Sequence, residues 1–325
     1  MKLMLIVAAL LLPYLVALAA FALLAKRTFN PWVTTFGACL LIISAPWLIP
    51  ADALMLRFVA SISAAVLALK VIDVSIDLEQ QRVPTWREYM AFLANPFTHV
   101  RRCLALERRP PWRENLMNLV ASSVGCTVGV ALLLGLFNVD GSRWSWGWGL
   151  GSSWGFLVEH ICKTVALLGT ISSALAGTAA AWRLCGGTAR DFMDKPYLAR
   201  TPAEFWRRYN RNVQQFFWQD VFKTKGGRRA PIRTMLGVFA LSALLHELIF
   251  FAALGRVQGY QTAFFLVQGI AAAATARIKV KGWLVIPWTA GTLAFNLVSS
   301  VLFFASIHGL VPFYSLGLPQ WLQGW

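Results

Sequence analysis

The feature that most constrains this chain is an uninterrupted apolar run over residues 3–25, closed by Lys26 and Arg27. About 20 apolar residues in a helix are enough to cross the hydrocarbon core of a bilayer. The run is longer than the apolar part of a secretory signal peptide, which is roughly 7–15 residues. We therefore expect residues 3–25 to form a transmembrane helix.

Similar apolar runs recur along the chain, of whose 325 residues 58% are hydrophobic and 14% charged. This composition excludes an ordinary soluble domain. The sequence predicts an all-α polytopic membrane protein, folded as one domain over residues 1–325. About eight transmembrane helices are expected, with seven or nine as alternatives: residues 3–25, 32–49, 52–72, 119–139, 155–182, 234–254, 260–276 and 283–309.

Two polar segments, residues 73–118 and 183–233, separate groups of these spans. In the first, Trp86, Tyr89, Met90 and Phe92 recur at helical spacing among arginines, which is typical of amphipathic helices that lie in the membrane interface. Lys70, near the end of its span, is expected to extend its charge toward that interface.

The basic residues indicate the orientation of the chain. It has 30 Lys and Arg against 14 Asp and Glu, and 25 of the 30 fall in the loops after the first, third, fifth and seventh predicted spans when Lys70, near the end of the third span, is counted with its loop. By the positive-inside rule these loops face the cytoplasm, with both termini outside. Membrane topology therefore explains the charge better than nucleic-acid binding. The small size and compact loops favour a multi-pass protein of the bacterial inner membrane.

A metal site and a disulfide framework are not expected. The five cysteines form no CxxC motif and no cluster with histidine; they are Cys39, Cys103, Cys126, Cys162 and Cys185.

The most informative stretch is residues 196–254. Its last part, residues 234–254, is apolar enough to cross the bilayer, yet it contains His246 and Glu247. Ionisable groups at membrane depth are costly, so a functional site is the default hypothesis. The alternative is that His246 forms a hydrogen bond between helices.

The first part of this stretch starts an amphipathic helix. Thr201 is a candidate N-cap, Pro202 occupies the first helical position, and Glu204 follows where it can return a bond to the cap amide. The helix is expected to continue with an apolar face at spacings of three and four, and with its arginines on anionic headgroups or a substrate: Trp206, Tyr209, Val213, Phe217 and Val221.

The sequence DKPYLARTPAEFWRRYN from residue 194, followed by SALLHELIFF from residue 242, resembles the signatures of the membrane-bound O-acyltransferase (MBOAT) superfamily, in particular its wax synthase branch. The resemblance covers about 60 residues, 194–251. This chain lacks the glycine that the plant members have between the tryptophan and the arginines, and it has Tyr209 where tryptophan is usual.

The resemblance implies that His246 is the catalytic histidine and Asn210 the second signature residue. It implies a substrate site with Trp206, Arg207, Arg208, Tyr209, Ser242 and Glu247. The donor would be acyl-coenzyme A as a co-substrate with no bound cofactor, and the acceptor a lipophilic alcohol entering from membrane lipids. Acylation of a sugar or exported polysaccharide is the rival enzymatic reading, and a transporter or structural membrane protein the non-enzymatic one.

Helical geometry separates the neighbours of His246. Glu247 lies about 100° around the helix from it, whereas Ser242, four residues earlier, shares its face. We therefore expect Ser242 rather than Glu247 to contact the imidazole.

A second polar group lies in the span 155–182. Glu159 and Lys163 are spaced for an i,i+4 ion pair, and His160 lies between them. A self-neutralising pair near the outer end of the span is preferred, and acceptor binding in the reaction chamber is the alternative.

Overall fold

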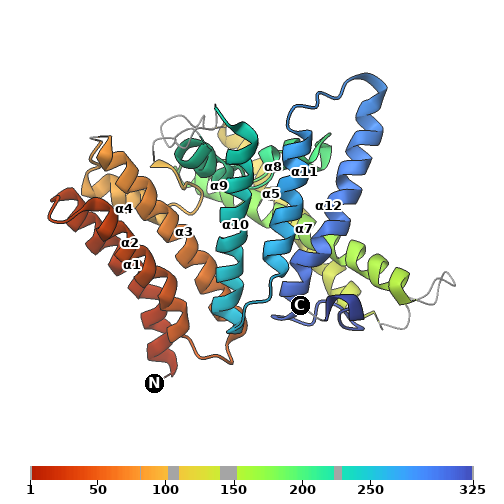
Figure 1. The fold of residues 1–325 in the computed structure, drawn as a ribbon, viewed down its shortest axis with the longest axis horizontal. Coiled ribbons are helices and arrows are strands. Elements are labelled where there is room, and N and C mark those ends of the chain that lie inside the picture. The colour runs from red at the N-terminus through yellow and green to blue at the C-terminus, as the bar shows by residue number, and fades with distance from the viewer. Residues whose placement is uncertain (1, 81, 102–109, 140–151, 223–228, 324–325) are drawn as a thin grey trace. The chain divides into compact units, whose positions relative to one another are not determined.

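The computed structural model describes residues 2–80, 82–101, 110–139, 152–222 and 229–323. Every regular element in these ranges is helical, which confirms the predicted all-α class (Figure 1). Cys103, three tryptophans of a predicted outer turn (Trp144, Trp146 and Trp148) and residues 223–228, which belong to a predicted basic loop, lie outside the described residues.

The chain divides into two compact units, each built from segments that are distant in sequence: Met1–Leu106 with Gln215–Gln258, and Glu107–Gln214 with Gly259–Trp325. We call them unit 1 and unit 2. The chain passes from unit 2 into unit 1 within the short helix α9 (Arg211–Phe216). That the two units form one functional domain stays a prediction.

Unit 1 contains the long helices α1 (Lys2–Ala25), α2 (Pro31–Ser44), α3 (Leu54–Glu79) and α10 (Pro231–Leu254). The first three pack against one another, and α10 packs against α3 (Figure 1). The shorter elements are a 3-10 turn (Ala45–Leu48), α4 (Trp86–Ala94) and a π-helical turn (Phe217–Phe222).

Unit 2 contains α5 (Trp112–Phe137), α7 (Ser152–Leu184), α11 (Tyr260–Thr275) and α12 (Val285–His308). The helices α5 and α7 pack side by side, as do α11 and α12 (Figure 1). Short 3-10 turns lie at Pro196–Leu198, Gly282–Leu284 and Gln320–Leu322, and the short helix α8 (Pro202–Arg208) packs on α11.

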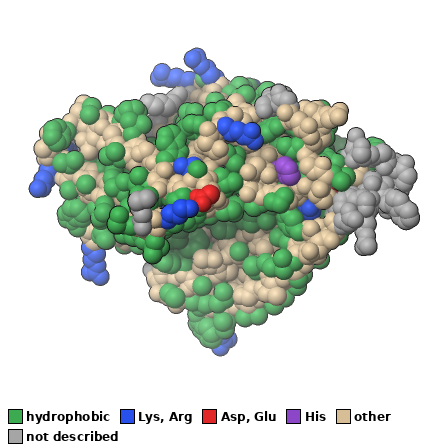
Figure 2. Space-filling model, turned by 90° about the horizontal axis from the view of Figure 1, so that it is seen from below, with side chains coloured by type: hydrophobic (Ala, Val, Ile, Leu, Met, Phe, Trp, Pro, Cys, Tyr) green, Lys and Arg blue, Asp and Glu red, His purple; other side chains and the backbone are tan. Residues whose placement is uncertain are grey.

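Seven helices in the described part of the chain are long and apolar enough to cross a membrane. They correspond to seven of the eight predicted spans. The eighth, residues 260–276, is α11, whose 16 residues give a helix of about 24 Å, shorter than a hydrocarbon core of about 30 Å. Apolar side chains cover much of the face seen in Figure 2. The protein is an integral multi-pass membrane protein; its orientation and its location in a bacterial inner membrane stay predictions.

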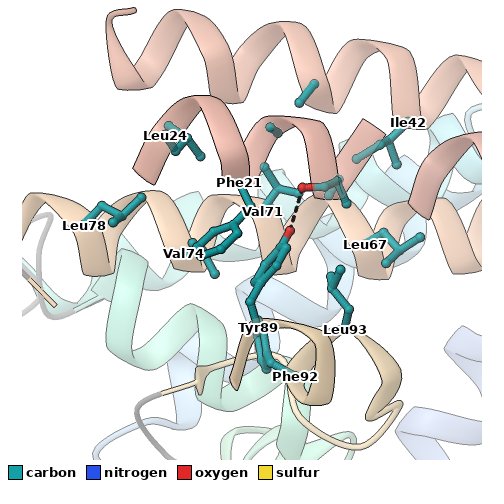
Figure 3. Close-up of a cluster of buried hydrophobic side chains, with 14 of the residues drawn as sticks. Phe21, Leu24, Ile42, Leu67, Val71, Val74, Leu78, Tyr89, Phe92 and Leu93 are labelled. Carbon is teal, nitrogen blue, oxygen red and sulfur yellow. Dashed lines mark hydrogen bonds between the residues drawn. The ribbon is translucent and has the colours of Figure 1, made fainter. Parts of the chain in front are cut away.

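Helix α4 has a more buried position than the predicted interfacial one. Its Tyr89 and Phe92 are buried with residues of α1 and α3, and the Tyr89 ring stacks on Phe21 at a centroid distance of 4.2 Å. The Tyr89 hydroxyl donates to the carbonyl of Ala17 at 2.8 Å (Figure 3). Trp86, whose ring meets the same Phe21 edge to face at a centroid distance of 4.8 Å, remains half exposed, so only part of the predicted interfacial face is available to lipid.

Lys70 corrects another expectation, because its side chain is buried and does not reach for the interface. Its ammonium donates to the carbonyls of Phe92 at 2.7 Å, Leu93 at 3.2 Å and Asn95 at 2.6 Å. The last carbonyls of a helix lack partners within the helix, and a cation there is favourable. Lys70 therefore caps the C-terminal end of α4 from α3.

Candidate active site

His246 lies in the second half of α10, eight residues before the last residue of that helix. At 1.5 Å per residue this is about 12 Å from the end of the helix. Its ring nitrogen Nδ1 lies 2.8 Å from the backbone carbonyl oxygen of Ser242. The predicted contact with Ser242 is therefore present, but the backbone makes it rather than the hydroxyl group.

This hydrogen bond fixes the tautomer of His246. A carbonyl oxygen only accepts hydrogen bonds, so Nδ1 must carry the proton that is donated to Ser242. In the neutral imidazole the basic lone pair is then on Nε2. The arrangement thus assigns the lone pair of a neutral His246 side chain to one defined nitrogen, as a general base would require.

Glu247 is buried, and its carboxylate accepts the backbone N–H of Gln258 at 2.8 Å. Gln258 follows Gly255, which ends α10 in the left-handed conformation at φ 73°. A carboxylate bonded to a backbone amide stabilises the turn. Glu247 thus has a structural partner in unit 1, and its predicted role in substrate binding stays a prediction.

Helix α8 begins at Pro202 as predicted, with the Thr201 side chain accepting the N–H of Glu204 at 3.1 Å. The Glu204 carboxylate accepts the N–H of Arg200 at 2.9 Å, so the return bond goes to the residue before the cap. It also pairs with Arg208 at 2.7 Å. The first turn of α8 is therefore stabilised both by the Thr201 cap and by the contacts of the Glu204 carboxylate.

The predicted continuous helix is interrupted after Arg208. Two backbone hydrogen bonds connect the end of α8 to the segment before it. The Asp194 N–H donates to the Arg208 carbonyl, and the Arg211 N–H donates to the Phe192 carbonyl, both at 2.8 Å. Asn210, between α8 and α9, has φ 43°. A residue in this left-handed conformation cannot continue a right-handed helix. The predicted apolar residues from 206 to 221 therefore do not lie along one face of a single helix.

Asn210 is suited to this position, because asparagine tolerates the left-handed conformation better than most residues. Its side-chain oxygen Oδ1 lies 3.4 Å from the N–H of Val213, and its backbone carbonyl accepts the N–H of Gln214 at 3.0 Å. Asn210 therefore starts α9. It belongs to unit 2, whereas His246 belongs to unit 1.

Trp206 is anchored inside unit 2. Its indole N–H donates to Gln268 of α11 at 2.9 Å, and the Gln268 amide donates to Ser299 of α12 at 2.8 Å. Gln268 is 1% exposed and lies in an apolar helix. Gln268 was not among the predicted site residues, although a glutamine within a predicted span is a signal of a buried polar contact.

The remaining motif residues differ in exposure. Arg207 is exposed, whereas Arg208 is held by Glu204 and by the carbonyl of Asp194. Tyr209 stacks on Phe205 at a centroid distance of 5.3 Å, and burial raises the pKa of its hydroxyl. Arg207 is thus the motif arginine better placed to meet a soluble anion.

All eight predicted site residues lie within residues 142–308, and this region matches the model of the MBOAT, membrane-bound O-acyltransferase family. The chain belongs to the membrane-bound O-acyltransferase family.

Two relatives from Arabidopsis thaliana indicate which branch of the family the chain resembles. The chain is 29% identical over 164 residues to probable long-chain-alcohol O-fatty-acyltransferase 1, covering 46% of this chain and 44% of the relative. It is 32% identical over 114 residues to probable long-chain-alcohol O-fatty-acyltransferase 2, covering 32% and 33%. The chain thus matches less than half the length of these relatives. The predicted likeness to the wax synthase branch of the MBOAT family is confirmed.

In this member of the MBOAT family, the polar side chains of α7 form hydrogen bonds with the C-terminal segment. Lys163 pairs with Glu159 at 2.6 Å and donates to the carbonyl of Phe313 at 2.8 Å. Glu159 also accepts the N–H of Ser315 at 2.8 Å. This geometry favours the predicted self-neutralising pair, with residues 313–315 as its partners.

His160, between them, has both ring nitrogens engaged. Nε2 lies 2.9 Å from the carbonyl of Leu297 and therefore carries the proton, so Nδ1 accepts from the hydroxyl of Tyr314 at 2.8 Å. A histidine held in this way lacks an available basic nitrogen. The described contacts of His160 therefore favour a structural role for this side chain over a role as a general base.

Proposed function

We propose that this protein is an O-acyltransferase that moves a fatty acyl group from acyl-coenzyme A to the hydroxyl of a lipophilic alcohol. Family membership supports the reaction class, and the names of the two Arabidopsis relatives support the acceptor class. The single observation that carries the mechanism is the Nδ1 hydrogen bond of His246 within α10, which places the basic lone pair on Nε2.

The chemistry assigned to His246 is general base catalysis. Nε2 takes the proton from the acceptor hydroxyl as its oxygen attacks the thioester carbonyl. The tetrahedral intermediate then collapses, the carbon–sulfur bond breaks, and the coenzyme A thiolate leaves and recovers the proton from the imidazolium. The products are an ester and free coenzyme A. A positioned base of this kind contributes roughly 10²–10⁴ in rate.

The motif in unit 2 is assigned to the donor. The side-chain amide of Asn210 has an N–H₂ group that can donate to a thioester oxygen or to the coenzyme A arm. Arg207, which is exposed, is assigned to the coenzyme A phosphates, because a guanidinium suits phosphate geometry. Trp206 and Tyr209, whose rings meet edge to face at a centroid distance of 5.7 Å, are assigned to the apolar part of the donor site.

The test uses membranes that contain wild type or His246→Ala at matched abundance. Each receives labelled long-chain acyl-coenzyme A or acetyl-coenzyme A, with a panel of acceptors: a fatty alcohol, diacylglycerol, a sterol-like alcohol and a sugar. Mass spectrometry identifies the esters. We expect a long-chain ester of the fatty alcohol from the wild type and about 10²-fold less or lower from the variant.

Other products would redirect the proposal. A sugar ester formed from the short donor would favour the polysaccharide reading. Equal ester formation by wild type and variant would remove His246 from the mechanism. The absence of any ester with either donor would favour a transporter or a structural membrane protein.

A further inference from the structure

An open apolar groove of about 550 Å³ lies in unit 2. It is bounded by Pro202 at the start of α8, Thr275 at the end of α11, and one side of the first half of α12. It is lined by Leu284, the last residue of the 3-10 turn before α12, and by Pro287, Gly291 and Phe295 of α12, which recur at spacings of three and four residues. Such spacing places them along one face of a helix.

The length of the groove fits one leaflet of a bilayer. Residues 284–295 rise about 16 Å along the helix, and half of a hydrocarbon core of about 30 Å is about 15 Å. Trp283, 79% exposed, stands at one end, and Trp288 lines the wall. Tryptophans of this kind mark the interface between membrane and water.

A cationic turn lies next to the same end. The sequence ARIKVKG, from residue 276, has three basic residues and no acidic one, and all three are exposed: Arg277, Lys279 and Lys281. The turn is tied to the segment before α8, because the Arg200 guanidinium donates to the carbonyl of Val280 at 3.1 Å. Basic residues at the membrane surface attract anionic lipid headgroups.

We propose that this groove binds one anionic phospholipid, with an acyl chain along α12 and its phosphate on the basic turn. The charge of the turn selects the headgroup, and the apolar wall holds the chain. Because the groove is open rather than enclosed, the second acyl chain can remain in the bilayer.

A reacting acyl donor fits the groove less well than a bound lipid. Among the described residues, those that line it include no histidine, acid, lysine or cysteine. The Thr275 hydroxyl is already engaged, since it donates to the carbonyl of Ala271 at 2.7 Å and accepts the N–H of Ala203 at 3.2 Å. The inference does not depend on the proposed acyltransferase activity.

Gly291 offers a direct way to block the groove. A Cβ added at Gly291 meets no atom within 4 Å, so Gly291→Leu can place its side chain in the groove without a clash at its first atom. Gly169 in α7 is a matched control, because a Cβ there also meets nothing within 4 Å and Gly169 does not line the groove. Both changes remove a helical glycine, which favours the helix.

The experiment is native mass spectrometry of the full chain in detergent. Phosphatidylglycerol, phosphatidylcholine with the same chains, and oleoyl-coenzyme A are titrated separately and in competition. We expect the wild type and Gly169→Leu to retain one phosphatidylglycerol, at least about 10-fold more tightly than phosphatidylcholine. Gly291→Leu should lose this binding by about 10-fold or more, and Arg277→Gln/Lys279→Gln/Lys281→Gln should lose the preference between the two lipids.

Three outcomes would overturn the proposal. The first is equal affinity of the wild type for the two phospholipids, and the second is phosphatidylglycerol binding by Gly291→Leu at the wild-type level. The third is a loss confined to oleoyl-coenzyme A in Gly291→Leu, which would make the groove part of the donor site. Thermal unfolding of each variant, compared with Gly169→Leu, separates a filled groove from a misfolded chain.

Discussion

The imidazole of His246 is oriented by the helix that carries it, because Nδ1 donates to the carbonyl of Ser242 four residues earlier. The side chain of Ser242 is not needed for this bond. At the residue scale, sequence spacing predicted the right neighbour, but periodicity does not distinguish a hydroxyl from a backbone carbonyl on the same helical face.

Ser242→Ala should therefore leave acyl transfer within about threefold of the wild type, because the carbonyl that fixes the tautomer remains; such a change corresponds to less than about 1 kcal/mol. The transfer rate and its pH profile check this, with His246→Ala as the inactive reference. A loss of tenfold or more, or a shifted pH profile, would assign the hydroxyl a role of its own.

His99 gives a pH-dependent prediction. Burial, with the nearby charge of Lys70 as a smaller cause, lowers the pKa of His99 from 6.5 to about 4. Below pH 6.5 the unfolded chain therefore binds a proton at His99, whereas the folded protein leaves His99 neutral until the pH approaches 4. Stability present above pH 6.5 is lost as the pH falls toward 4, by about 1.4 kcal/mol per pH unit.

Thermal unfolding of wild type and His99→Gln at pH 7 and pH 5 measures this effect. From pH 6.5 to pH 5 the wild type should lose about 2 kcal/mol more than the variant, which has no titrating group at this position. An equal loss in both proteins would show that His99 is protonated without cost in the folded state.

At the element scale, the break between α8 and α9 shows how tertiary contacts override a local pattern. The apolar spacing from Trp206 to Val221 fits one long helix, yet the backbone bonds to residues 192 and 194 end α8 at Arg208. These partners lie upstream of the helix start, and no periodicity within the helix reveals them. The N-cap at Thr201 was predictable because its signal is local.

Substitutions at Asn210 distinguish a role in backbone conformation from a role in binding the acyl donor. Asn210→Gly keeps the left-handed φ of 43° without strain, whereas Asn210→Ala should lower the free energy of unfolding by about 1 kcal/mol. If the amide also binds the acyl donor, both variants should lose activity. Unfolding and transfer assays on both variants decide: activity retained by Asn210→Gly would restrict Asn210 to a conformational role.

The ion pair of α7 gives a second prediction at this scale. Lys163→Met leaves Glu159 buried without its cation, and removal of one partner of a buried pair costs about 3–5 kcal/mol. The double change Glu159→Gln/Lys163→Met should recover much of this loss. Thermal unfolding and proteolysis of the C-terminal segment from residue 309 measure this loss and its recovery. Equal destabilisation by the single and double changes would mean that the ion pair does not hold the C-terminal segment in place.

At the scale of the whole molecule, long apolar runs predicted the all-α class and about eight spanning helices, because burial in lipid demands both length and composition. Seven of these eight are long and apolar enough to span in the described part of the chain. The positions of α4 and of the Lys70 cap were not predictable, since they depend on contacts between distant segments. Resemblance to a family singled out the motif residues 206–210 and 246, and their joint role in one site stays a prediction; the local partners of each residue were not predictable from the sequence.

The proposed role of His246 is that of the base in an acyl transfer. The most direct measurement is the transfer rate from oleoyl-coenzyme A to a long-chain alcohol in nanodiscs, for wild type, His246→Gln and the control His308→Gln at equal folded protein. His308 accepts the N–H of Tyr314 through Nδ1, and glutamine can preserve such a contact. We predict that His246→Gln is slower by roughly 10²–10⁴, while His308→Gln stays near the wild-type rate. A loss below about tenfold in His246→Gln, or an equal loss in both variants, would contradict the claim.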